Sequence, residues 1–395
     1  MWAQGRPSWA PLELVGEVII EPSSILPWGL VVFPTIAFGL NVFNAFAWPR
    51  HGSPGAKASV SVLIPARNEE RGIELAVRSV FEAGADVEEV IVYDDGSSDQ
   101  TPQILARLAD EFPRLRIEKG IGLPDGWVGK PHACHQLARL ASGDVLLFLD
   151  ADVEILPGGL DHVLGLMADK KADLVTAVPR QITGSFVERL VLPLLHLTYT
   201  SWLPMPLVWL STDPRFLAAN GQVLAVHRQA YDAVGGFEAV RNEVVDDMAF
   251  CRLIKKAGHR VVFADGHDMA KCRMYTNANG VWEGFSKNLY EGIGASFVGL
   301  LGMLSLYTLA FVAPYIALIL SVWWTSLLWP ATVAVGLNVA IRILLAIRHK
   351  HALEGVLLHP FSVIVLMAIA INSWLWNWNG TIRWSGRTYA ARSNR

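Results

Sequence analysis

Charged residues are absent from three long tracts of this sequence. No Asp, Glu, Lys or Arg occurs in residues 22–49, 292–341 and 355–382, which have lengths of 28, 50 and 28 residues. About 20 apolar residues in a helix, each rising about 1.5 Å, cross a bilayer core about 30 Å thick. The two shorter tracts therefore have room for one spanning helix each, and the longer tract has room for two. The predicted spans are Trp28–Trp48, Val298–Leu320, Trp323–Ile347 and Val356–Trp376.

The residues between the first two tracts have the composition of a soluble domain. Residues 50–291 hold 57 of the 69 charged residues, so about 24% of their positions are charged, as in an ordinary globular domain. We therefore predict an N-terminal region with a membrane anchor at 1–49, a soluble domain at 50–291 and a C-terminal transmembrane region at 292–395. The first tract has no basic segment before it and no small-residue cleavage site after it, so we expect a retained anchor.

Charge and cysteine content exclude several classes of protein. The net charge is −3 and no long run of Lys or Arg occurs, so nucleic acid is not an expected partner. The cysteines, Cys134, Cys251 and Cys272, are odd in number and form no CxxC pair. This argues against a disulfide framework and against a cysteine zinc site, and it suits a reduced, cytosol-facing domain.

Basic residues beside the spans indicate the orientation in the membrane. Arg50 and Lys57 follow the first span, and Arg348 and Lys350 lie near the end of the third. By the positive-inside rule, we expect a multi-pass protein of the cytoplasmic membrane whose soluble domain faces the cytoplasm. By the same rule the basic C-terminal tail is expected on the cytoplasmic side, whereas four full crossings would put the tail on the opposite side of the membrane from the soluble domain. Whether the last segment spans or is re-entrant stays open. The tail arginines are Arg383, Arg387, Arg392 and Arg395.

Short apolar runs alternate with helical segments in the first half of the soluble domain. These runs are rich in Val, Ile and Leu, as buried strands are. The alternation predicts an α/β fold with a mostly parallel, Rossmann-like sheet, whose ligands bind beyond the carboxyl ends of the strands. The predicted strands are Ser59–Pro65, Glu89–Asp95, Leu115–Lys119, Val145–Asp152 and Leu174–Val178.

Polar residues follow three of these strands. Each cluster alone is explained equally well by turn or helix-cap chemistry, but three clusters at one edge of a sheet indicate a shared ligand site. In the strand that ends LFLDADV, Asp150 and Asp152 are two positions apart, so their side chains point the same way. Such a pair is suited to bind a hard divalent cation that also contacts phosphate oxygens. The clusters are Arg67, Asn68 and Glu69; Asp94, Asp95, Ser97 and Ser98; and Asp150 and Asp152.

Seven segments of the sequence carry longer motifs. Four of them are SVLIPARNEE at 61–70, VIVYDDGSSDQT at 90–101, LLFLDADVEI at 146–155 and VGGFEAVRNEVVDDMAFCRLIKKAG at 234–258. Together these four resemble the successive signatures of family 2 glycosyltransferases, which have the GT-A fold. The others are GWVGKPHACHQLA at 126–138, RMYTNANGVWEGFSKNLYEG at 273–292 and WSGRTY at 384–389. These three are similar to segments of membrane glycosyltransferases of carotenoid (hydroxychlorobactene-type) and hopanoid pathways.

The resemblance implies roles for individual residues. Asp150 and Asp152 would hold Mg²⁺ or Mn²⁺ with the donor diphosphate, Asp152 being the surer ligand. Asp247 would be the catalytic base, beside Asp246, which replaces the family's usual Glu. The residues implied to contact the nucleotide sugar are Pro65, Arg67, Glu69, Asp95, Lys130 and Asp150.

Two of these assignments have structural alternatives. Asp246 and Asp247 precede a segment with helical spacing, so either one can simply cap that helix. Arg273, Trp282 and Lys287 lie just before the long charge-free tract. They are suited to close over the diphosphate and shape an acceptor entrance, but an amphipathic helix lying on the membrane predicts the same residues.

Residues 186–212 form an apolar segment inside the soluble domain. Pro193, Pro204 and Pro206 would break a spanning helix there. We expect an interfacial or re-entrant element that admits a membrane-embedded acceptor to the active site. A buried core segment is the alternative.

Together these features predict a membrane-bound, inverting glycosyltransferase. It would transfer a single sugar from a nucleotide sugar, expected to be a UDP-sugar, to a hydroxyl of a lipid-soluble acceptor such as a carotenoid or hopanoid. The QxxRW pattern of processive polysaccharide synthases is absent. Two alternatives stay open: a polyprenyl-phosphate sugar synthase, and a transporter subunit with a nucleotide-binding domain. The second predicts charges within the spans, whereas residues 292–341 have none.

Overall fold

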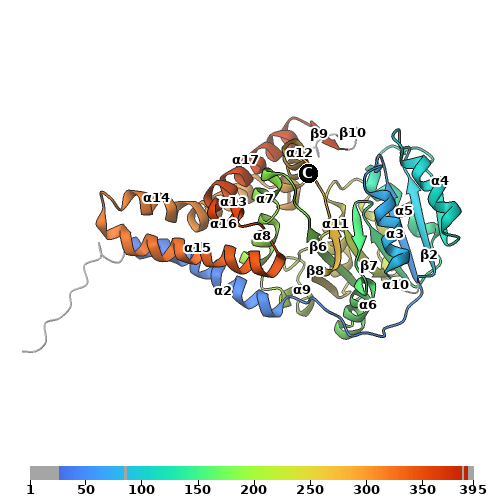
Figure 1. The fold of residues 1–395 in the computed structure, drawn as a ribbon, viewed down its shortest axis with the longest axis horizontal. Coiled ribbons are helices and arrows are strands. Elements are labelled where there is room, and N and C mark those ends of the chain that lie inside the picture. The colour runs from blue at the N-terminus through green and yellow to red at the C-terminus, as the bar shows by residue number, and fades with distance from the viewer. Residues whose placement is uncertain (1–25, 84–86, 385–386, 390–395) are drawn as a thin grey trace, which may run out of the picture.

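The computed structural model describes residues 26–83, 87–384 and 387–389, and an eight-stranded sheet forms the centre of its soluble part (Figure 1). The strand order is β3-β2-β1-β4-β7-β6-β8-β5. Neighbours from β3 to β4 are parallel, and so are β6 and β8, whereas β7 is antiparallel to β4 and β6. The predicted α/β fold with a mostly parallel sheet is confirmed. The strands are β1 Val60–Ala66, β2 Glu89–Asp94, β3 Leu115–Lys119, β4 Val145–Leu149, β5 Val153–Ile155, β6 Leu174–Gln181, β7 Val223–His227 and β8 Val261–Cys272.

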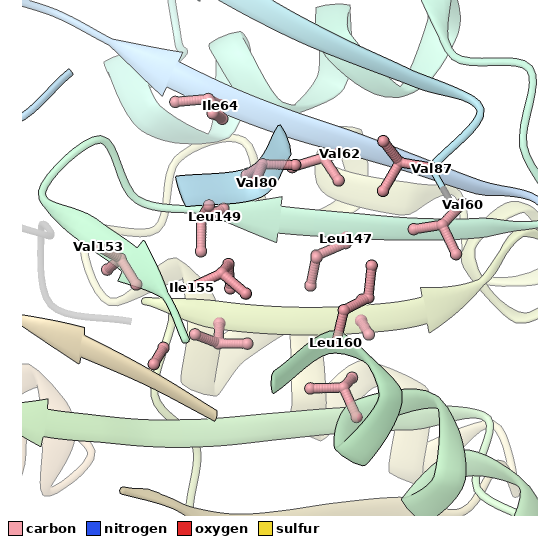
Figure 2. Packing of buried hydrophobic residues seen from close by; sticks show 14 of the residues in the cluster. Val60, Val62, Ile64, Val80, Val87, Leu147, Leu149, Val153, Ile155 and Leu160 are labelled. Carbon is pink, nitrogen blue, oxygen red and sulfur yellow. The ribbon is translucent and has the colours of Figure 1, made fainter. Parts of the chain in front are cut away.

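Helices cover both faces of this sheet because alternate residues of a strand point to opposite sides. In β1, Val62 and Ile64 enter one hydrophobic cluster (Figure 2), together with residues of α3, α4 and α6. Leu63 enters a second cluster with residues of α5 and α11. A strand buried on both faces therefore appears in the sequence as an unbroken apolar run. These helices are α3 Ile73–Glu82, α4 Thr101–Glu111, α5 Gly129–Leu140, α6 Gly159–Lys170 and α11 Asp246–Lys256.

Four helices in the described part of the chain are long and apolar enough to cross a membrane, in agreement with the predicted spans. In Figure 1, α2, α14 and α15 extend away from the sheet at one end of the molecule. The helices are Leu26–Ala47 (η1 Leu26–Val31 and α2 Val32–Ala47), Phe297–Leu320 (α13 Phe297–Tyr307, η3 Thr308–Val312 and α14 Ala313–Leu320), Thr325–His349 (η4 Thr325–Leu327 and α15 Leu328–His349) and His359–Trp378 (α17).

The last span differs from its predicted start. It begins at His359 and not near Val356, because Val356 lies in a separate short helix, α16 (Glu354–Leu357), and Pro360 occupies the first turn of α17. Arg342 is buried within the third span, near its end, and its Nε donates to the carbonyl of Gly355 at 3.1 Å. This arginine therefore fixes the connection between the third and fourth spans.

Past the last span, residues 382–384 (β9) and 387–389 (β10) form a two-stranded antiparallel sheet. Of the tail arginines, Arg383 and Arg387 belong to these strands, whereas Arg392 and Arg395 lie outside the described residues.

Residues 186–212 form three short helices that are interrupted at prolines. Asn44 of the anchor helix α2 supplies hydrogen bonds at the break between the second and third. Its Nδ2 donates to the carbonyls of Thr200 (2.9 Å) and Leu203 (2.8 Å), and its Oδ1 accepts from the backbone N–H of Met205 (2.9 Å). Buried backbone groups need such partners, which explains a buried asparagine in a membrane helix. The helices are α7 Phe186–Val191, α8 Leu194–Trp202 and α9 Pro206–Leu210.

Four histidines gather where α8, β8 and the end of α15 meet: His196, His267, His349 and His351. The ring centroids of His196 and His349 are 3.8 Å apart. Burial lowers the pKa of His196 to about 3 and that of His267 to about 4, so both rings are neutral at pH 7. The junction between the sheet and the third span therefore contains at least two uncharged imidazoles, beside the ion pair of Arg348 with Asp265.

We expect His196 and His267 to lower the stability of the fold as the pH falls from about 6.5 towards 4. In the unfolded chain His196 and His267 take up protons near their ordinary pKa of 6.5, whereas the folded chain keeps both neutral. Each ring thus destabilises the fold by up to about 1.4 kcal/mol per pH unit in this window. Between pH 7 and pH 5 the thermal unfolding midpoint in detergent should fall more, or rise less, in wild type than in His196→Phe. An equal change of midpoint in the two proteins would contradict this expectation.

Candidate active site

A cavity of about 1370 Å³ lies at the edge of the sheet where β1, β2 and β4 end. Of the residues that the sequence singled out, Trp282 does not line it, and neither do Asp94, Ser97 and Ser98 of the polar cluster that follows β2. Trp282 is 37% exposed on α12 (Ala278–Gly292), whereas Phe285 and Lys287 of the same helix reach the cavity. The residues that do line it are Pro65, Arg67, Glu69, Asp95, Lys130, Asp150, Asp152, Asp246, Asp247, Arg273 and Lys287.

The two aspartates of the LFLDADV motif lie on a turn. The expectation that one strand continues to Asp152 is wrong, because β4 ends at Leu149 and the chain turns before β5. The backbone N–H of Val153 donates to the carbonyl of Asp150 at 3.1 Å, which closes the turn. The N–H of Asp150 donates in turn to the carbonyl of Gln222 at 3.1 Å. A tight turn, and not strand periodicity, therefore brings both carboxylates to the cavity.

Three carboxylates crowd this turn, and the pKa values of Glu69 and Asp152 are raised there. Burial, then the charges of Asp152 and Asp150, raise the pKa of Glu69 to about 8. Burial and the charge of Asp150 raise the pKa of Asp152 to about 6. Such a set of oxygen ligands fits Mg²⁺ or Mn²⁺. Among the described residues no group of three or more His, Cys, Asp or Glu is arranged to hold a metal ion.

Lysines balance part of this negative charge. Lys130 Nζ lies 2.5 Å from Asp150 Oδ1. Burial alone would lower the pKa of Lys130, but Asp150 and Asp246 outweigh it and raise that pKa. Burial lowers the pKa of Lys287 to about 8, although Asp246 opposes this. The centre of the cavity therefore holds a persistent cation at Lys130 and a titratable one at Lys287.

Asp247 lies in the first turn of α11, close to Lys130. A methyl group added to Gly221 would lie 3.1 Å from Asp247 Cβ and 3.3 Å from Lys130 Nζ, so a larger residue there would displace these side chains by a few tenths of an ångström. Asp247 Oδ1 also accepts from the backbone N–H of Met248 at 2.7 Å. The N-cap residue of α11 is Val245, so neither aspartate is the cap, and Asp247 lines the cavity while it accepts this bond from the first turn. The sequence alone had not indicated Gly221.

The loops that follow β1 and β2 are tied to each other. Arg67 Nη1 donates to the carbonyl of Asp95, and the N–H of Glu69 donates to Thr101 Oγ1 at 2.8 Å. Between them Asn68 adopts a left-handed conformation with φ of 57°, which asparagine tolerates better than most residues. These contacts hold the polar ends of two neighbouring strands in one rim of the cavity.

Membrane helices supply another part of the cavity wall. Met303 and Tyr307 of α13 and Leu366 of α17 line it, although all three belong to spans. The hydroxyl of Tyr307 donates to Thr198 Oγ1 at 2.9 Å, which joins α13 to the proline-broken segment. Sequence reasoning missed these residues. One cavity therefore contacts both the acidic turn and the interior of the membrane bundle.

Comparisons with known proteins agree with this architecture. Residues 61–234 match the family model described as glycosyl transferase family 2. The chain is 26% identical over 341 residues to 4,4'-diaponeurosporenoate glycosyltransferase of Staphylococcus aureus, covering 84% of this chain and 88% of that protein. Mannosyltransferase PcManGT from Pyrobaculum calidifontis, solved in complex with GDP-Man and Mn²⁺, superimposes with a TM-score of 0.56 at 19% identity, covering 89% of this chain and 99% of that one.

Proposed function

We propose that this chain, a glycosyltransferase with a family 2 domain and the GT-A fold, transfers one sugar from a nucleotide sugar to a hydroxyl of a lipid-soluble acceptor. The observation that carries this proposal is the lining of the cavity. Asp152 and Asp247 line it together with Met303 and Leu366 of the membrane spans. A water-soluble donor and an apolar acceptor can therefore reach the same space. A carotenoid or a hopanoid is an acceptor of this class.

The donor, expected to be a UDP-sugar, would lie over the carboxyl ends of β1, β2 and β4. In this assignment Pro65, Arg67, Glu69 and Asp95 contact the nucleotide, and Lys130 with Asp150 and Asp152 faces the diphosphate. The position of Lys130 Nζ, 2.5 Å from Asp150, supports the second part, because a cation there attracts the leaving group. Mg²⁺ or Mn²⁺, when bound to Asp150 and Asp152, would neutralise further charge on the diphosphate.

Asp247 would act as the general base in a single displacement. Its carboxylate takes the proton of the acceptor hydroxyl as the hydroxyl oxygen bonds to the anomeric carbon. The bond from that carbon to the diphosphate oxygen breaks in the same step, and the diphosphate leaves with its electron pair towards Lys130. Attack opposite the leaving group inverts the configuration of the sugar. The closeness of Asp247 to Lys130, across Gly221, supports this division of roles.

Further parts of the assignment concern the acceptor and the membrane. We assign residues 50–291 to the catalytic domain and residues 186–212 to the acceptor entrance. In this view Asp246, Arg273 and Lys287 shape the cavity around the two substrates. The basic residues Arg50 and Arg348 favour a catalytic domain on the cytoplasmic face of the cell membrane.

The direct test is to incubate membranes containing the protein with a panel of labelled nucleotide sugars, with Mn²⁺ or Mg²⁺ present, and to identify labelled lipids by mass spectrometry. We expect one sugar on a neutral lipid hydroxyl. A labelled polyprenyl phosphate would replace this proposal with a polyprenyl-phosphate sugar synthase. A labelled polymer would show processive synthesis, and no transfer to any lipid would reopen the transporter alternative.

Filling the cavity from its membrane side should affect the acceptor alone. We expect Leu366→Trp to raise the KM for the lipid acceptor at least about tenfold, because the larger ring occupies space that the acceptor needs. The KM for the donor should stay within about twofold of wild type, on the same reasoning. Leu375→Trp is the matched control, since Leu375 is 41% exposed on the same helix. Equal effects of both variants would contradict the acceptor assignment.

A further inference from the structure

Cys272, at the end of β8, lies in a chain of buried hydrogen bonds that leads to Asp152. Gln181 Nε2 donates to Gln222 Oε1 at 3.0 Å, and Gln222 Nε2 donates to Cys272 Sγ at 2.8 Å. The side chain of Cys272 is hydrogen-bonded in turn to Asp152. An ionised carboxylate can only accept, so the thiol is the donor in this last bond.

The sheet itself aligns these groups. Val153 of β5 is opposite Cys272 in the antiparallel pair with β8, and the preceding Asp152 belongs to the turn that leads into β5. Gln181 of β6 is opposite Cys272 from the other side. Segments distant in sequence thus meet near one sulfur atom, where Gln222 and Cys272 are both buried.

Gln222 also holds the second aspartate of the turn. Its backbone carbonyl accepts from the N–H of Asp150 at 3.1 Å, while its side chain reaches Asp152 through the thiol. One residue therefore anchors the main chain of Asp150 and the side chain of Asp152. Removing a group that orients a metal ligand in this way typically weakens metal binding by about 10- to 100-fold.

We propose that Cys272, oriented by Gln222, is a positioning residue that holds the carboxylate of Asp152 in the orientation needed to bind a divalent cation together with Asp150. This inference rests on the proposed function, in which those aspartates hold the cation. The thiol itself takes no part in bond making or breaking. A hydroxyl can replace it as a donor, whereas a methyl group cannot.

The test is a titration of the purified protein with Mn²⁺ in the presence of UDP, followed by electron paramagnetic resonance of the free ion. We expect Cys272→Ala to weaken Mn²⁺ binding about tenfold and Cys272→Ser to restore it to within about threefold of wild type. Cys272→Val, which fills the space of the sulfur without a donor, should behave like Cys272→Ala. Cys251→Ala is the control, because Cys251 is equally buried but belongs to the hydrophobic cluster on the opposite face of the sheet from Cys272.

The outcomes separate this inference from the proposed function. If wild type binds Mn²⁺ and all Cys272 variants bind it equally well, the positioning role is wrong while the metal assignment stands. If wild type binds no Mn²⁺ with UDP, both are overturned. Equal losses in Cys272→Ser and Cys272→Val, together with lower unfolding temperatures in both, would show that Cys272 serves packing alone and would overturn the inference.

Discussion

Replacing Asp247 by asparagine should lower the turnover of sugar transfer about 10³-fold, within the range that general bases contribute. The change replaces the carboxylate by a neutral amide of nearly the same size. Asparagine keeps an oxygen that can accept from the N–H of Met248, so the first turn of α11 should be retained. We therefore expect unchanged binding of the nucleotide sugar, measured by calorimetry, alongside the lost transfer, measured with labelled donor.

Asp110→Asn is the matched control for this variant, because Asp110 is exposed on α4 and does not line the cavity. Near-normal turnover of Asp247→Asn would contradict attack by a hydroxyl. It would favour an acceptor oxygen that is already ionised, such as a phosphate, which needs little help from a base. Loss of donor binding together with turnover would instead assign Asp247 to the donor site.

Much of the fold could be predicted because its signals are local. A strand buried on both faces leaves an apolar run, and a membrane span leaves a tract without charge, whatever the rest of the chain does. The site residues at the ends of β1, β2 and β4 follow from the same logic, since parallel strands end at one edge. This reasoning fails for the local structure at Asp150 and Asp152, because an apolar run does not reveal where a strand ends and a turn begins.

The remaining site residues depend on contacts that no local pattern records. Cys272 follows Asp152 by 120 positions and meets it only through the antiparallel pairing of β5 with β8. Gly221 is informative only once Asp247 and Lys130 are known to flank it. Met303 and Leu366 are apolar, and an apolar side chain is suited both to contact lipid and to line a cavity. Hydrophobicity therefore does not indicate which of the two they face.

The anchor helix shows the same dependence on distant partners. Asn44 is polar within a charge-free tract, and on its own it weakens the case for a span. Its three bonds to the break between α8 and α9 give it a structural role in joining the membrane part to the proline-broken segment. If that segment admits the acceptor, the anchor helps to shape the entrance as well as tethering the domain.

Replacing Asp152 by asparagine should weaken Mn²⁺ binding in the presence of UDP at least about tenfold, because the turn loses one of its two proposed anionic ligands. Asp161→Asn, an exposed change on α6, should bind Mn²⁺ as wild type does. Calorimetric titration in buffers of different protonation enthalpy would measure both the affinity and any protons released. An affinity unchanged from wild type would remove Asp152 from the metal site.

Proton release provides a second, independent test of this prediction. Burial, together with the charges of Asp152 and Asp150, raises the pKa of Glu69 to about 8, so in the metal-free protein at pH 7 its carboxyl carries a proton. A divalent cation at the turn would offset those charges, lower the pKa of Glu69 and expel the proton. We therefore expect Mn²⁺ binding to wild type at pH 7 to release protons and to tighten as the pH rises towards 8. Asp152→Asn removes one charge that raises the pKa of Glu69, so this variant should release fewer protons. Uptake of protons on binding, or release unchanged by Asp152→Asn, would show that the cation does not bind at this turn.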